Sequence, residues 1–179
     1  ISVGNTPTVR LEDGLFPVGE SNLGAEDCRR LILTPLTPDQ RQRLLNDRKL
    51  DVACTLDSHH LRAICTYQRG SLSACFKSIP PLVSWEELGL PAQFRRLISN
   101  RKSGLFLLGS GALNRLSTVV ASLTDSLSQS SAMHLVCIER ISEHTFSDAR
   151  SGFVTQLNIQ EDFSSTDDAL QHAIKLRPD

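Results

Sequence analysis

One stretch, residues 104–122, constrains the fold of this chain more than any other. It opens with the apolar run Gly104–Leu108, which is typical of a buried strand in a parallel sheet. A turn of small residues follows. The helix predicted after it carries apolar residues at helical spacing, namely Leu116, Val119, Val120 and Leu123. Strand, small-residue turn and helix is the architecture of a phosphate-binding loop, in which backbone N–H groups at a helix N-terminus face a phosphate.

The residues of this loop depart from the pattern G-x-x-x-x-G-K-[ST] in both registers in which it can be placed. In one register, Asn114 stands for the second glycine, Arg115 for the lysine and Leu116 for the magnesium-binding hydroxyl. In the other, Ser117 takes the hydroxyl position, but Arg115 replaces the glycine and Leu116 the lysine. An arginine hinders the close approach of backbone to phosphate, and a leucine removes the charge. These residues alone therefore also fit an ordinary strand–turn–helix unit that holds no phosphate.

Composition limits the classes of protein to consider. At 179 residues the chain fits one large or two small domains. A net charge of −1 gives no overall electrostatic reason to expect a nucleic-acid partner. No apolar run approaches the ~20 residues of a membrane span, and no signal peptide is expected. The five cysteines are odd in number and form no C-x-x-C pair. Four of them, Cys54, Cys65, Cys75 and Cys137, lie within apolar or alternating runs, so buried thiols in a reducing cytoplasm are expected rather than disulfides or a metal site.

The first part of the chain predicts a hairpin and two helices. Thr8–Leu11 and Leu15–Val18 flank Glu12-Asp13-Gly14, a strong hairpin signal. A helix is expected over Ala25–Leu33, with Cys28, Leu31 and Ile32 on its buried face. Thr37-Pro38 caps and opens a second helix, which should bury Leu44 and Leu45 and stop at Asn46-Asp47.

Three strands are expected next, over Leu50–Leu56, Leu61–Tyr67 and Ser71–Ile79. The turns between them are short enough for antiparallel neighbours. Residues 1–80 therefore read as a small α+β domain, which Pro80-Pro81 ends because proline can extend neither a strand ladder nor a helix.

A helical linker is predicted over residues 81–103. Ser84-Trp85-Glu86-Glu87 should begin a short helix with a serine cap, and Ala92–Ser99 should form a second one. Residues 104–179 then form the second domain, in which Ser126–Ser131 is expected to be a serine-rich turn.

The rest of the second domain predicts further strands and a helix. Met133–Ile138 should be a strand parallel to Gly104–Leu108, with the intervening helix packed on their sheet. Phe153–Ile159 is a third candidate strand, and Thr166–Leu176 a helix. Glu139 follows the Met133–Ile138 strand directly, and the C-terminal ends of strands are where open α/β sheets bind their ligands.

The chain resembles the pilus-retraction ATPases of the twitching-motility (PilT-like) family, in the type II/type IV secretion ATPase superfamily. Short motifs of that family recur in order along nearly the whole sequence. They match Glu12-Asp13-Gly14, His60-Leu61-Arg62, Arg69-Gly70, Phe76–Pro80, Glu86–Gly89, Gly104–Ser110, Ile138–Glu143 and Ala169–Asp179. The ungapped match at Gly104–Ser110 favours the second of the two loop registers.

The resemblance implies an α/β protein, with a PAS-like N-terminal domain over residues 1–80 and a partial RecA-like ATPase core over residues 104–179. It also implies a cytoplasmic hexamer, peripheral at the inner membrane, with ATP and Mg²⁺ as cofactors. The expected catalytic residues are Glu139 and Glu143, with Ser117 as the metal-binding residue. The expected nucleotide-binding residues are Ser110, Gly111, Ala112, Asn114, Arg115, Ser117 and Thr118, together with Arg62 and Arg69 reaching from a neighbouring subunit.

Departures from the family pattern bear directly on activity. Leu116 holds the lysine position, Leu113 and Arg115 replace loop glycines, and Arg140 replaces an aspartate of the acidic motif. The family's Walker B strand would begin after Asp179. The favoured interpretation is a degenerate relative that acts as a non-hydrolytic binding or assembly module, through self-association or on hexameric motor subunits or pilus and secretion platform proteins. Alternatives are an active nucleoside triphosphatase and a PAS-like sensor carried by the first domain.

Overall fold

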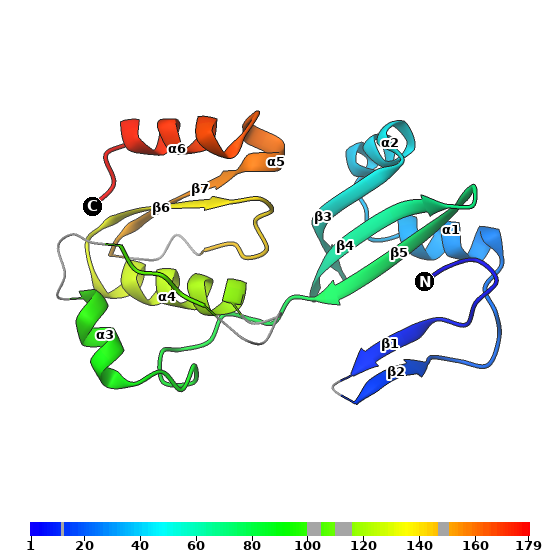
Figure 1. Cartoon of the computed structure of the whole chain (residues 1–179), viewed down its shortest axis with the longest axis horizontal. Coiled ribbons are helices and arrows are strands. Elements are labelled where there is room, and N and C mark those ends of the chain that lie inside the picture. Colours follow the sequence, from blue (N-terminus) through cyan, green and yellow to red (C-terminus); the bar gives the residue numbers. More distant parts are fainter. Residues whose placement is uncertain (12, 100–104, 110–115, 147–150) are drawn as a thin grey trace. The chain divides into compact units, whose positions relative to one another are not determined.

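The structure is a computed structural model that describes residues 1–11, 13–99, 105–109, 116–146 and 151–179. The chain divides into two compact units, Ile1–Ile79 and Pro80–Asp179. Both mix helices and strands (Figure 1). Within the described part of the chain, none of the helices is long and apolar enough to cross a membrane.

The first unit contains a hairpin, two helices and a three-stranded sheet. The hairpin joins β1 (Thr8–Leu11) to β2 (Gly14–Pro17) in antiparallel register. Helices α1 (Ala25–Leu33) and α2 (Pro38–Asp47) follow. The sheet is an antiparallel meander in the order β3-β4-β5, formed by β3 (Lys49–Leu56), β4 (His59–Gln68) and β5 (Ser71–Ser78). These elements confirm the predicted hairpin, helices and strands to within a few residues at each end.

Capping chemistry explains why α2 begins and ends where it does. The Thr37 side chain accepts a hydrogen bond from the Gln40 N–H, and the Gln40 side chain accepts one from the Thr37 N–H, which forms a complete capping box. Pro38 lies in the first turn, where its missing N–H costs nothing. Arg48 ends the helix with a left-handed φ of 60°.

The core of the first unit lies between the two helices and one face of the sheet. Alternate residues of each strand point to this face, because side-chain direction alternates along a strand. The fully or nearly fully buried members are Cys28, Ile32, Leu36, Leu44, Leu50, Val52, Ala63, Cys65, Leu72 and Ala74. Two leucines expected in this core, Leu31 and Leu45, are instead 42% exposed. Each is next in sequence to a buried residue, and neighbours in a helix point about 100° apart, so only one of the two can face the sheet.

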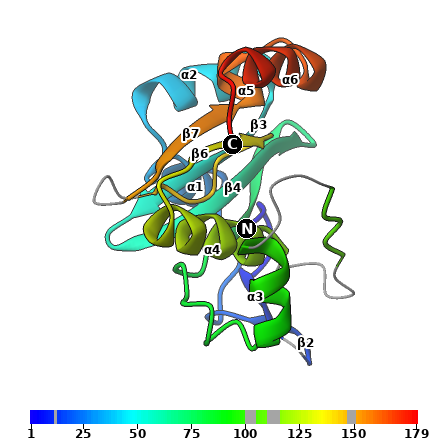
Figure 2. The ribbon, with the colours of Figure 1, turned by 90° about the vertical axis from the view of Figure 1, so that its left-hand side faces the viewer.

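The second unit is a three-layer arrangement around a parallel pair of strands. Strands β6 (His134–Glu139) and β7 (Phe153–Asn158) pair in parallel, with Cys137 opposite Gln156. Helix α4 (Leu116–Ser130) lies on one side of the pair and α6 (Thr166–Lys175) on the other, as two views at right angles show (Figures 1 and 2). Helix α3 (Ala92–Ser99) precedes them, and the short α5 (Ile159–Asp162) follows β7.

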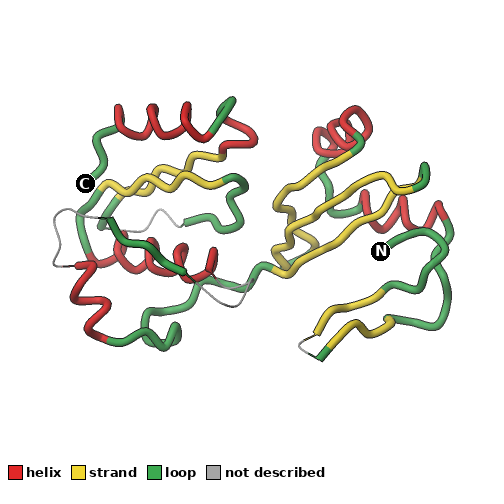
Figure 3. The backbone as a smooth tube through the Cα atoms, in the orientation of Figure 1, coloured by secondary structure: helices red, strands yellow, loops and turns green. Residues whose placement is uncertain are grey.

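The predicted strand at Gly104–Leu108 is wrong for the residues that the structure describes. Residues 105–109 form no strand and run as loop (Figure 3). The side chains of Leu105 and Leu107 are 84% and 87% exposed. Phe106 between them is also exposed, at 40%, whereas a strand buried on both faces hides its side chains, and a parallel strand needs a hydrogen-bonded neighbour. In the described residues β6 has β7 as its strand neighbour, so the expected pairing with this run is not formed.

The serine-rich stretch after Leu123 was predicted to be a turn, and this too is wrong. Helix α4 continues through it to Ser130. The hydroxyl of Ser128 donates to the Asp125 carbonyl at 2.8 Å, and that of Ser130 donates to the Ser126 carbonyl at 2.8 Å. Serines that bond back to carbonyls of the preceding turn need no other partner, so they do not end the helix.

The prediction of a short helix beginning at Ser84 is also wrong, because residues 85–89 form only a turn. The predicted serine cap is present nonetheless: the Ser84 hydroxyl accepts from the Glu87 N–H, and the Glu87 carboxylate accepts from the Ser84 N–H at 2.8 Å. Gly89, at a φ of +66°, directs the chain out of the turn before a helix can extend. Trp85 is buried here and stacks on Phe94 of α3.

Candidate functional site

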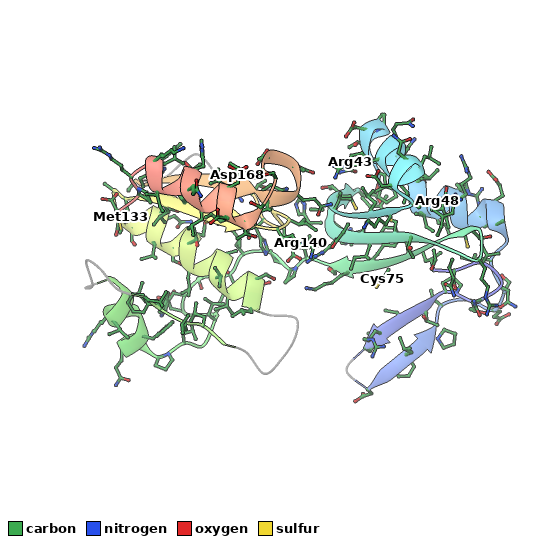
Figure 4. All side chains as sticks on the ribbon, turned by 45° about the horizontal axis from the view of Figure 1, so that its top comes forward. Arg43, Arg48, Cys75, Met133, Arg140 and Asp168 are labelled. Carbon is green, nitrogen blue, oxygen red and sulfur yellow. The ribbon has the colours of Figure 1, made fainter. Side chains whose placement is uncertain are left out.

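The candidate site lies at the C-terminal end of β6, beside the first turn of α4. Strand β6 ends at Glu139, and the chain continues through Arg140, which lies at the opposite end of the strand from Met133 (Figure 4). Glu143 follows in the loop that leaves this edge. Because the strand and the loop bring both carboxylates to the edge where α4 begins, Glu143 reaches the helix: the Ser117 hydroxyl donates to its Oε2 at 3.0 Å.

Glu139 is a partly buried carboxylate at this edge. Burial raises the pKa of Glu139 above its ordinary value, the nearby polar side chains of Ser142 and Gln156 offset part of that rise, and the negative charge of Glu143 adds to it. Gln156 is held in place in turn, because its side-chain N–H₂ donates to the His144 carbonyl at 2.7 Å. Partial burial beside polar side chains makes Glu139 a candidate functional carboxylate.

The structure brings together some of the predicted site residues and not others. Ser117, Glu139 and Glu143 meet at one edge of the second unit, and Thr118 is buried in the first turn of α4. The predicted loop residues Ser110, Gly111, Ala112, Asn114 and Arg115 lie outside the described residues.

The two arginines predicted to reach a nucleotide lie in the first unit. Arg62 on β4 forms a two-pronged ion pair with Asp51 on β3, with Nε–Oδ1 at 2.8 Å and Nη2–Oδ2 at 2.9 Å. Arg69 is exposed in the turn between β4 and β5, where it adopts a left-handed φ of 51°. The nucleotide-binding role of both residues stays a prediction.

Sequence reasoning missed Gln156 and Ser142 as neighbours of Glu139. A signal for Gln156 was available, since it is a polar residue within the otherwise largely apolar run Phe153–Leu157. Its position opposite Cys137 follows only from the register of the parallel pair, which the sequence does not specify.

Comparisons with known proteins bear on what this site is. No model of a known protein family matches the chain. The type IV pilus ATPase PilU of Pseudomonas aeruginosa is 23% identical over 181 aligned positions, which take in all of this chain and 47% of PilU. The type IV pilus retraction ATPase PilT of the same organism is 24% identical, over all of this chain and 52% of PilT. The chain thus spans about half the length of the curated relatives it matches.

The match to a solved structure is stronger than the matches to the curated sequences. A crystal structure of the pilus retraction motor PilT with bound ADP superposes on the whole chain with a TM-score of 0.81 and 30% identity, and the match covers 52% of that PilT chain. The chain belongs to the PilT-like superfamily of type II and type IV secretion ATPases. The ATPase DotB of Legionella pneumophila shares the fold, with a TM-score of 0.71 at 18% identity over 98% of this chain and 51% of DotB. The predicted α/β fold class is confirmed.

The described residues of this PilT-like chain match only part of a nucleotide site. Oxygen donors from Ser117 and Glu143 are of the kind that Mg²⁺ prefers. However, within the described ranges no group of three or more His, Cys, Asp or Glu side chains is placed to hold a metal ion. Leu116, an apolar side chain 37% exposed at the start of α4, stands where the loop pattern requires a lysine. The role of this loop toward the terminal phosphates of a nucleotide stays a prediction, because residues 110–115 lie outside the described part of the chain.

Proposed function

We propose that this chain is a degenerate PilT-like motor homologue that acts as a non-hydrolytic binding or assembly module of a type IV pilus or secretion system. It would work at the cytoplasmic side of the membrane, by self-association or by docking on hexameric motor ATPase subunits or platform proteins. The observation that carries this proposal is Leu116, an uncharged, partly exposed side chain directly before Ser117 in the first turn of α4.

The physical argument concerns charge at the transferred phosphoryl group. Phosphoryl transfer is catalysed almost wholly by positioning and by electrostatic stabilisation, and cationic groups on the terminal phosphates supply much of the latter. A leucine at the lysine position removes that contact while leaving Ser117 and Glu143 bonded to each other. The helix–sheet frame around them needs no lysine, so such a chain keeps the family fold and loses the reaction.

The test is a steady-state ATPase assay on the purified chain with Mg²⁺, alongside a calorimetric titration with ATP and Mg²⁺. We expect turnover no greater than the buffer background. Leu116→Lys alone should not restore turnover, because Arg115 still stands where a loop glycine is needed. A fourfold-concentrated enzyme sample serves as control, since genuine turnover scales with protein concentration. Turnover that scales in this way would reject the proposal and favour the alternative, an active nucleoside triphosphatase with a modified loop.

A further inference from the structure

The β1–β2 hairpin receives little support from the rest of the first unit. Every residue of its two strands except Gly14 is exposed. Figure 1 shows the two strands standing apart from the β3-β4-β5 sheet. Neither the buried core of this unit nor the partly buried apolar residues packed against it include any of the described residues 8–17. A two-stranded hairpin that packs on no core is only marginally stable in water, so it opens more readily than the sheet does.

The turn of this hairpin places an exposed aspartate directly before a glycine. Asp13 is exposed in the turn, and Gly14 begins β2 with a φ of +146°, a backbone conformation that favours glycine. Chain neighbours apart, no atom of the described residues lies within 4 Å of the place that a methyl group on Gly14 would occupy. The Gly14 nitrogen is therefore screened neither by a side chain of its own residue nor by a packed neighbour.

We propose that Asp13 is a site of spontaneous isoaspartate formation. The Gly14 nitrogen attacks Cγ of the protonated Asp13 carboxyl group. The N–Cγ bond forms, the Cγ–OH bond breaks, and the hydroxyl leaves with the Gly14 amide proton as water, which gives a five-membered succinimide. A second water then opens the ring. Cleavage of the new N–Cγ bond restores aspartate, whereas cleavage of the original peptide bond leaves an isoaspartyl residue whose main chain is longer by one CH₂.

The chain carries an internal control in the turn between β3 and β4. Asp57 is also exposed, and its turn also joins two antiparallel strands, with Leu56 opposite His59. However, Ser58 follows it, and a side chain on the attacking residue hinders ring closure. Both strands also belong to the sheet that carries the buried core, which holds this turn in place. We expect isoaspartate to form at Asp57 at about a tenth of the rate at Asp13 or less.

The experiment follows both sites in the full chain incubated at pH 7.4 and 37 °C, with and without guanidinium chloride. Trypsin releases residues 11–29 and 50–62 as separate peptides, and electron-transfer dissociation distinguishes isoaspartate from aspartate of equal mass. In the folded chain, isoaspartate should accumulate at Asp13 about tenfold faster than at Asp57. Denaturant should change the rate at Asp13 little, because that turn is already unsupported. Similar rates at the two sites in the folded chain, or isomerisation of Asp13 only after unfolding, would overturn the inference.

Two variants test the ring closure itself. Asp13→Glu keeps the charge, but its cyclisation needs a six-membered ring, so the isomerisation signal in this peptide should disappear. Asp13→Asn forms the same succinimide with loss of ammonia, and it should deamidate while the chain is folded, as circular dichroism confirms. An Asp13→Asn chain that keeps its amide while folded would show that the turn holds the Gly14 nitrogen away from Cγ, and the inference would be wrong.

Discussion

Gly152 offers a direct test of how the frame of the candidate site is held together. It lies just before β7, where its N–H donates to the Ser128 carbonyl of α4 at 2.8 Å. A methyl group on its Cα would lie 2.7 Å from the carbonyl oxygens of Met133 and Ser131, and 3.1 Å from that of Ser128. All three atoms are backbone, so no flexible side chain can move aside. The Gly152→Ala variant must therefore shift the start of β7 or the end of α4.

The expected cost follows from the overpacking of well-packed sites, which is about 1–3 kcal/mol. Because the three contacts are with backbone, we expect the upper part of that range, about 2–3 kcal/mol, or roughly a 30- to 150-fold rise in the unfolded fraction of the second unit. Urea unfolding followed by circular dichroism measures the difference, read from the transition midpoint at constant m-value.

The control for this experiment is Gly109→Ala in the same unit. In the described part of the chain, no atom lies within 4 Å of a methyl group at that position. Its free energy of unfolding should stay within about 0.5 kcal/mol of the wild type. If Gly152→Ala were as stable as Gly109→Ala, the tight junction of α4, β6 and β7 would not exist as described.

Three further predictions concern the first unit. Leu44→Ala should lower the free energy of unfolding, measured in urea, by about 2–5 kcal/mol, because Leu44 is fully buried. Leu45→Ala should lower it by less than about 1 kcal/mol, because Leu45 is 42% exposed. Thr37→Ala should cost about 1 kcal/mol in the same assay by removing the capping box of α2, and Thr37→Ser should recover most of it. When the folded chain is labelled with iodoacetamide at pH 8, peptide mass spectrometry should find the exposed Cys75 modified first. Cys65 should react only on unfolding, because burial raises the pKa of its thiol to about 11 and its thiolate is therefore scarce at that pH. Equal labelling of the two thiols in the folded chain would contradict the burial of Cys65.

Local chemistry explains which elements could be predicted from the sequence. Helix α2 is bounded by local signals: a capping box at Thr37 fixes its start, and the predicted stop at Asn46-Asp47 agrees with its end at Asp47. The meander β3-β4-β5 is similarly set by two short turns. The four-residue helix α5 was missed, although the Asn158 side chain caps it by accepting from the Gln160 N–H. A cap before so short a helix resembles any other Asx turn.

Elements whose state depends on distant partners could not be predicted in this way. The apolar run at Leu105–Leu107 has the composition of a buried strand, yet burial requires neighbours on both edges and both faces, which the run itself does not supply. The residues of the candidate site differ in the same way in whether the sequence could predict them. Glu139 was identified because it lies at the end of a strand, and Glu143 through the family resemblance, whereas Gln156 depended on the register of β6 with β7.

Most of the buried apolar residues that hold the second unit together lie outside the predicted nucleotide site. The buried residues of α4, β7 and α6 that hold the second unit together include Ala121, Leu123, Leu157, Ala169 and Ala173, and none of them belongs to the predicted phosphate loop. Leu116, at the position predicted for the loop lysine, is 37% exposed, so the residue type at this position should cost the fold little. A TM-score of 0.81 to a motor with bound ADP reports on the scaffold. The proposed function concerns instead the few groups at the β6 edge, where Glu143 is hydrogen-bonded to Ser117 at 3.0 Å. Two chains of this superfamily can thus share their core and differ in whether they hold a phosphate, and only measurements directed at that edge distinguish them.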